Sequence, residues 1–138
     1  MFAAALIAAA LTHISGPSPA MQLAAAQRAA AFHVLLLPSS TQLLRAEASK
    51  DGTEVRLDYS IEGSLIRVDE RVGGGQQSSP DPQAELFDLD GYPALYSESA
   101  GYRAISELTW YRPDVIVTLS SHDIVSAPLL VDMALELR

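Results

Sequence analysis

"EVRLDYSIEGSLIRVDERV", residues 54–72, is the stretch that decides the fold of this chain of 138 residues. Apolar and polar side chains alternate along its first half, with Val55, Leu57, Tyr59 and Ile61 set against Glu54, Arg56, Asp58 and Ser60. A period of two is typical of a strand with one buried and one solvated face. Glu62 and Gly63 supply a two-residue turn, after which Ile66 and Val68 can face the same core. The stretch predicts an antiparallel hairpin with charged side chains on its solvent face.

Strand signals continue on both sides of this hairpin. "TQLLRAEAS" precedes it across a turn at 50–52, and "AELFDLDGYPALYSES" follows it with a turn at 89–91. "LTWYRPDVIVTLSS", residues 108–121, predicts a further hairpin around an Arg-Pro-Asp turn. Both faces of that hairpin carry apolar residues, so we expect it at the centre of a sheet, or between a helix and a ligand or partner. "FHVLLLP", residues 32–38, is an apolar run stopped by Pro38 and predicts a buried strand.

The last segment, "SAPLLVDMALELR", predicts a helix that covers the sheet. Ser126 can cap it, and Pro128 is tolerated in its first turn. One helical stripe contains Leu129, Leu130, Met133, Ala134 and Leu137. The predicted fold class is therefore α+β: a curved antiparallel β-sheet of about six to eight strands, built from hairpins and covered by a C-terminal α-helix.

An uncharged apolar stretch, "MFAAALIAAAL", begins the chain and precedes "SGPSPA". It is too short for a bilayer span, which needs about 20 apolar residues. It suits the hydrophobic segment of a signal peptide, although no Lys or Arg precedes it; the alternatives are the trailing end of a transmembrane helix from a longer reading frame, and an Ala-rich cytosolic helix. We expect residues 1–20 to be a signal peptide or membrane-anchor remnant, 21–31 a helical connector, and 32–138 a single α+β domain, membrane-anchored or secreted and extracytoplasmic.

Composition limits the partners. Seventeen acidic and nine basic residues give a formal net charge of -8, which repels the phosphates of nucleic acids. The sequence has no run of Lys and Arg that would overcome this repulsion locally, so we expect no nucleic-acid partner. The chain has no cysteine, which excludes disulfides, thiolate metal sites and a thiol nucleophile.

Several polar clusters have the residue types of a catalytic site but not its spacing. Asp69 and Glu70 are neighbours in a strand, so their carboxylates point to opposite faces. The run 120–123 holds Ser, His and Asp too close together in sequence for the head-to-tail geometry of a hydrolase triad. The loop 73–83 has neither the Lys nor the following helix of a phosphate loop and is expected to be an exposed, flexible loop. We therefore predict that the chain is not an enzyme, with no catalytic residues.

Metal and cofactor sites are equally unsupported by the sequence. Asp88 and Asp90 resemble the opening of a calcium loop, but its later acidic ligands are missing, and turn chemistry explains both residues. His13, His33 and His122 lie far apart and lack the spacing of metal ligands. We expect no metal site and no cofactor.

Aromatic residues on the strands are the candidate ligand or partner surface: Tyr59, Trp110 and Tyr111. A core role is favoured for Trp110, because a buried Trp needs only one hydrogen-bond partner for its indole N–H.

The order of these segments resembles a known bacterial family. "AAAFHVLLLPSS", "VRLDYSIEGSLIRVDE", "LFDLDGYPALY", "LTWYRPDVIVTLSS" and a closing helix "PLLVDMALEL" together look like the domain of unknown function 4367 family, with Tyr59, Gly91 and Trp110 as the firmest points. The resemblance covers roughly residues 30 to 137. It implies an extracytoplasmic domain of membrane-anchored proteins that resemble anti-sigma factors, or of proteins that resemble lipoprotein carriers, and it implies no catalytic residue. In one respect the chain departs from the anti-sigma-like proteins: unless the reading frame is truncated, we expect no cytoplasmic sigma-binding region ahead of its apolar start.

Two functions follow as expectations. The first is a non-catalytic extracytoplasmic sensor or interaction domain, whose partner is a protein or envelope component at the membrane surface. The alternative is a carrier that binds an apolar or lipid-like ligand in a cleft between the sheet and its helix. The two are distinguished by whether Leu57, Tyr59, Leu108, Trp110 and Val117 bury one another or leave a cavity.

Overall fold

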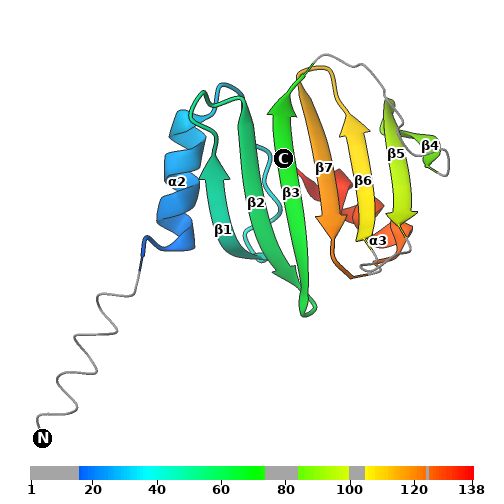
Figure 1. Ribbon diagram of the computed structural model, residues 1–138, viewed down its shortest axis with the longest axis horizontal. Helices are drawn as coiled ribbons and strands as arrows, with labels where there is room; N and C mark the ends of the chain where they lie inside the picture. The colour runs from blue at the N-terminus through cyan, green and yellow to red at the C-terminus, as the bar shows by residue number, and fades with distance from the viewer. Residues whose placement is uncertain (1–15, 74–83, 100–104, 124) are drawn as a thin grey trace, which may run out of the picture.

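A computed structural model describes residues 16–73, 84–99, 105–123 and 125–138 (Figure 1). Its elements are α2 (Pro19–Ala29), β1 (Gln42–Ala48), β2 (Glu54–Ile61), β3 (Ser64–Val72), β4 (Glu85–Leu89), β5 (Tyr92–Ser99), β6 (Ile105–Tyr111), β7 (Val115–Ser121) and α3 (Ala127–Glu136). The predicted α+β class is confirmed. Most of the segment 1–20 and all but the first residue of the loop 73–83 lie outside the described residues.

The strands form one seven-stranded sheet in the order β1-β2-β3-β7-β6-β5-β4, and every neighbouring pair is antiparallel. Two meanders, β1-β2-β3 and β4-β5-β6-β7, are joined where the last strand pairs with β3 (Figure 1). The hairpin 108–121 therefore occupies the central region of the sheet, as its two apolar faces predict.

The predicted turns have the backbone conformation that their residues favour. Glu62 and Gly63 have φ values of 50° and 81°, and Asp90 and Gly91 have 53° and 86°. Two successive positive φ values are the signature of the tight hairpin turn that matches the twist of the flanking strands. The side chain of Asp88 accepts the N–H of Gly91, which confirms a turn role for this aspartate.

The helix α3 covers one face of the sheet, which we call the inner face (Figure 1). Its buried side chains are Leu130, Met133 and Ala134, and Leu137 follows them at the C-cap, also buried. They belong to one core cluster with inner-face residues of the strands, among them Leu57, Val68, Leu108 and Leu119. The predicted covering helix is thus confirmed. Ser126 stands at its N-cap, but the Ser126 side chain makes no capping hydrogen bond.

The strand predicted at 32–38 was wrong. Residues 33–37, which we call the strap, are extended but belong to no sheet, although Val34, Leu35 and Leu37 are buried. The strap pairs with the end of the chain instead: Leu36 N–H donates to Arg138 O at 2.8 Å, and Arg138 N–H donates to Leu36 O at 3.0 Å. An unbroken apolar run predicts that a segment is buried, but a buried segment need not be a strand of a sheet.

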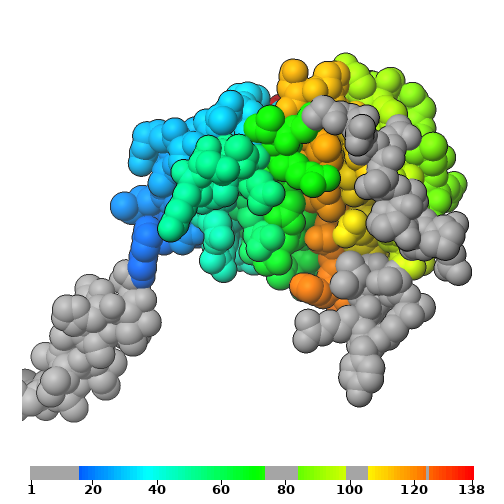
Figure 2. Space-filling model, turned by 45° about the horizontal axis from the view of Figure 1, so that its top comes forward, coloured from blue at the N-terminus to red at the C-terminus, as the bar shows by residue number. Residues whose placement is uncertain are grey.

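The helix α2 packs beside β1 at one edge of the sheet, and the two form a continuous surface (Figure 2). Ala26 is buried there, and Gln22 Oε1 accepts the N–H of Ala46 at 3.0 Å. Gly52 approaches the end of α2 so closely that a Cβ atom would lie 2.1 Å from Ala29 O. Within the described ranges, no helix is both long and apolar enough to cross a membrane.

Candidate functional site

The three aromatic residues predicted as a surface do not lie together. Tyr59 and Trp110 are buried in the inner-face core, where Leu37 N–H donates to Tyr59 Oη and Trp110 Nε1 donates to Leu89 O at 3.0 Å. Tyr111 follows Trp110 in β6 and so faces the opposite side of the sheet, where it pairs with Ile116 and is also buried. The structure confirms the core role favoured for Trp110, which is buried and whose indole N–H donates to one partner, Leu89 O.

The interface between the sheet and α3 is filled by side chains. The five residues that distinguish the two expected functions, Leu57, Tyr59, Leu108, Trp110 and Val117, are at most 3% exposed and belong to one core cluster. At the positions of these five residues the interface is therefore packed core, not an open cleft.

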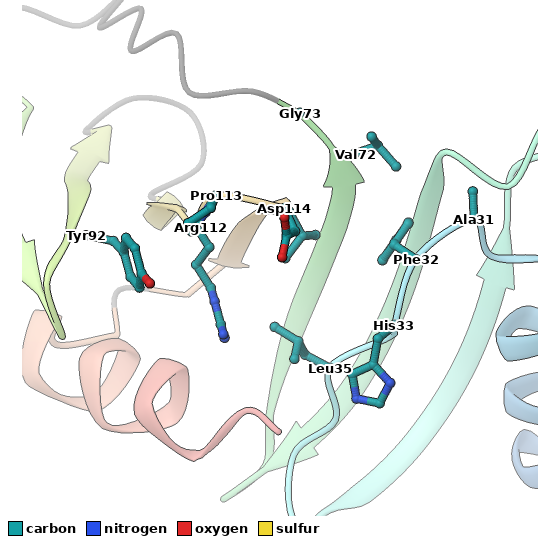
Figure 3. A pocket seen from close by; sticks show the side chains of 11 residues that line it. Ala31, Phe32, His33, Leu35, Val72, Gly73, Tyr92, Arg112, Pro113 and Asp114 are labelled. Carbon is teal, nitrogen blue, oxygen red and sulfur yellow. The ribbon is translucent and has the colours of Figure 1, made fainter.

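A pocket of about 680 Å³ lies at one end of the inner face, and we call it the end pocket (Figure 3). It forms where the strap and the residues before it meet the end of β3, the start of β5 and the β6–β7 turn. Phe32, Leu35, Val72 and Tyr92 supply much of its apolar lining. This volume is in the range of small-ligand sites, roughly 300–1,000 Å³.

Arg112 supplies the positive charge of the end pocket. Its side chain extends from the β6–β7 turn into the space between Tyr92 and Leu35 (Figure 3). The backbone N–H of Arg112 donates to Val115 O, which closes the turn, and its guanidinium carbon lies 4.9 Å from the ring centroid of Trp110. Within the described residues, Arg112 makes no ion pair, not even with Asp114 two residues along the same turn. The guanidinium is therefore held by the indole, while its donors have no acidic partner there.

Glu70, which the sequence analysis considered only as the neighbour of Asp69, is a buried carboxyl next to the end pocket residue Leu35. Its side chain points to the inner face, fully buried, and Leu35 N–H donates to Glu70 Oε1 at 2.8 Å. The second oxygen, Oε2, has no hydrogen-bond partner among the described residues. Burial raises the pKa of Glu70 to about 8, although the bond from Leu35 and the charge of Arg112 act in the opposite direction. At neutral pH this carboxyl is therefore mostly protonated.

A signal for Glu70 was present in the sequence. It follows Ile66 and Val68 at the same spacing of two, so the alternation of β3 places it on the apolar face. Asp69 points to the outer face, as the spacing argument requires, and its Oδ1 accepts a hydrogen bond from Arg56 Nε at 2.8 Å. In the sequence analysis Asp69 and Glu70 were placed on opposite faces of the strand, but which of the two is buried was not predicted.

The other polar clusters keep structural roles. Near the end of β7, Ser121 Oγ accepts the N–H of Asp123, and His122 is exposed, so this run forms no head-to-tail triad. His33 is exposed at the end pocket, not within a cluster of ligands. In the part of the chain that the structure describes, no group of three or more His, Asp or Glu side chains could hold a metal ion.

A second hollow, of about 600 Å³, lies between the start of α2, the residues after the strap and β1, and we call it the α2 cleft. Leu23, Leu36, Leu37 and Leu43 are among its apolar lining residues. Tyr59, which is buried in the core, reaches the floor of this cleft.

Comparison of the chain with protein-family models, with curated proteins and with solved structures finds no match.

Proposed function

We propose that this chain is a non-catalytic extracytoplasmic sensor or interaction domain of a bacterial membrane-associated or secreted protein. Its partner is a protein or envelope component at the membrane surface, and its contact site is the end pocket. The observation that carries this proposal is Arg112, which projects into an accessible pocket without an acidic partner among the described residues. The resemblance of the chain to the domain of unknown function 4367 family supports the same class of function.

The geometry favours recognition over chemistry. A general acid–base or nucleophilic site requires reactive groups within hydrogen-bond reach of one another. Arg112, Tyr92, His33 and Asp114 are described residues that share the end pocket, but no hydrogen bond links their side chains. A cation held on an aromatic ring, with apolar walls around it, is a common basis for binding specificity.

The location can be tested with a single introduced thiol, because the chain has no cysteine of its own. Val72 lines the end pocket and is 50% exposed, so Val72→Cys places a reactive group at the pocket. A membrane-impermeant maleimide added to intact spheroplasts should label this variant. Labelling that requires lysis of the cells would contradict an extracytoplasmic position.

The contact site can be tested with the same variant. A maleimide-linked benzophenone attached to the thiol of Val72→Cys should form a discrete photo-crosslinked adduct in the envelope. The control is Leu44→Cys on β1, away from the pocket and 41% exposed. An adduct of equal yield from both positions, or from neither, would overturn the end pocket as the contact site.

The α2 cleft favours a second candidate function, a carrier of an apolar or lipid-like ligand. Its lining is rich in leucine, whereas the sheet–α3 interface, where a carrier cleft was expected, is packed core. Mass spectrometry of lipid extracted from the purified protein should then find a stoichiometric ligand. In Leu23→Trp the larger side chain fills the cleft, so this variant should lose the ligand. The control Leu44→Trp changes an exposed residue of β1 and should retain the ligand. Protein without a bound lipid would count against the carrier.

A further inference from the structure

The end pocket has the chemistry of a specific ligand class. We propose that it binds a carboxylate carried by a flat apolar group, with the Arg112 guanidinium as the counter-ion. This inference rests on the proposed function, because it names the chemical group that a partner would present to the same site.

Arg112 is the cation among the residues that line the end pocket. A guanidinium presents a planar fork of N–H groups that matches the two oxygens of a carboxylate. The guanidinium carbon lies over the Trp110 ring, 4.9 Å from its centroid, and within the described residues Arg112 makes no ion pair. The net charge of -8 repels anions at long range, and recognition of an anion therefore depends on this local cation.

The walls of the end pocket are aromatic and aliphatic. Tyr92 lies on one side of Arg112, and Leu35 and Phe32 lie on the other (Figure 3). These walls suit a flat apolar group, since aromatic and aliphatic surfaces gain most when they exclude water from each other. A carboxylate held a few bonds from such a group would pair with Arg112 while the apolar part occupies the pocket.

Glu70 determines whether the charge of Arg112 is available. It interacts electrostatically with Arg112, and an ionised Glu70 would compensate this cation from beneath the strap. Because burial raises the pKa of Glu70 to about 8, the carboxyl is mostly neutral at pH 7 and leaves Arg112 uncompensated. The other charged or titratable groups near this pair are Tyr59 in β2, Tyr92, Asp114 and His33 at the pocket, and Arg138 at the chain end beside the strap.

The test compares two probes that differ by one charge, N-acetylphenylalanine and its neutral amide. NMR titration of the full chain at pH 7 should show the acid shifting the signals of Arg112 and Tyr92, and binding at least about tenfold more tightly than the amide. Arg112→Gln should abolish that preference. The control Arg71→Gln removes the same charge from an exposed position on the outer face of β3 and should leave it unchanged.

A second readout uses pH in the native fold. Between pH 7 and pH 9, above the range in which histidines ordinarily titrate, the affinity for the acid should fall in the wild type as Glu70 ionises. In Glu70→Gln the affinity should stay level. This variant retains Arg112, so the measurement remains informative if Arg112→Gln folds poorly.

Each outcome decides the inference. Preference for the acid that depends on Arg112 supports it, and a longer probe, acetyl-Gly-Gly-Phe, then shows whether the pocket accepts a peptide C-terminus or only a small acid. Equal binding of acid and amide, binding unchanged by Arg112→Gln, or no binding of either probe would overturn it. The thiol experiments at Val72 use no carboxylate, so they test the proposed function independently.

Discussion

The neighbouring carboxylates Asp69 and Glu70 lie on opposite faces of β3 and differ in their exposure to solvent. Asp69 lies on the outer face, 39% exposed at its side chain, with Arg56 beside it. Glu70 lies on the inner face under the strap, with one oxygen bonded to Leu35 N–H and the other without a partner among the described residues. The peptide between them places one carboxylate in water and the other in the core.

The difference shows that burial, not residue type, sets the charge state here. A solvated carboxylate keeps its charge at little cost, whereas removal from water disfavours the charged form of a buried one. The outer face of β2 and β3 therefore carries paired ions, Asp58 with Arg67 and Arg56 with Asp69. On the inner face, burial raises the pKa of Glu70 to about 8 and so favours its neutral form. Substitutions on each face test this contrast.

The largest effect should come from removing the cover of the inner face. Deletion of Pro128–Arg138 takes away the buried side chains of α3 and both backbone bonds between Arg138 and Leu36. At about 25 cal/mol per Å² of apolar surface, the loss amounts to several kcal/mol, and cooperative unfolding should disappear. Leu135→Ala is the matched control, because Leu135 is 37% exposed on the same helix. Differential scanning calorimetry of a truncated chain that still shows one sharp transition would contradict the placement of α3.

The next largest effect should be a pH dependence owed to Glu70. Its pKa is 4.5 ordinarily and about 8 in the folded chain, so the folded state holds the proton more tightly. Stability from this group is full below pH 4.5 and is lost as pH rises through about 8. The loss is at most about 5 kcal/mol, since a tenfold change in proton affinity corresponds to about 1.4 kcal/mol.

Urea unfolding from pH 5 to pH 9 measures this dependence. Glu70→Gln should equal the wild type near pH 5 and be more stable by several kcal/mol at pH 9. Asp69→Asn, one residue away on the solvated face, should follow the pH profile of the wild type. A wild-type profile parallel to that of Glu70→Gln would mean that Glu70 ionises in the folded state as easily as in water.

Local patterns predicted most of this fold. The alternation from Val55 to Ile61, the turns at Gly63 and Gly91, and the apolar stripe of α3 each depend on residues a few positions apart. Such signals are physical properties of a short segment, and they were confirmed. The apolar run of the strap reported burial correctly but not a strand, because its backbone partner, Arg138, lies at the other end of the chain.

The candidate site could not be predicted in the same way. Phe32, Val72, Tyr92 and Arg112 come together only because β3 pairs with β7 and the second meander begins at the far edge of the sheet. No local pattern contains that pairing. In the sequence analysis Trp110 was considered because it is the single tryptophan. The residue that lines the pocket is Arg112, two positions further along, and its guanidinium carbon lies over the Trp110 ring. The family resemblance and the extracytoplasmic location stay predictions.

A smaller effect is expected at the better buried of the two ion pairs that link β2 and β3 on the outer face. Arg67 donates two hydrogen bonds to Asp58, at 2.9 and 3.3 Å, and the Asp58 side chain is 8% exposed. The hydrogen bonds that Arg67 donates to Asp58 raise the pKa of Arg67. Asp58→Asn should lower the unfolding free energy by about 1–2 kcal/mol, because a partly buried guanidinium loses its counter-ion. Glu54→Gln, exposed on the same strand, should change it by less than about 0.5 kcal/mol.

The smallest effect on stability should come from Asp69, although its neighbour is Glu70, the carboxyl expected to make stability depend on pH. Its pair with Arg56 is exposed on both sides, 48% for Arg56 and 39% for Asp69. Exposed ion pairs contribute about 0–1 kcal/mol, and salt screens them. Asp69→Asn should therefore lower the unfolding free energy by less than about 1 kcal/mol in dilute buffer, and the difference should vanish in about 1 M NaCl. A loss above about 2 kcal/mol that salt does not reduce would place Asp69 in a desolvated environment, and the contrast between the two faces of β3 would fail at the residue next to Glu70.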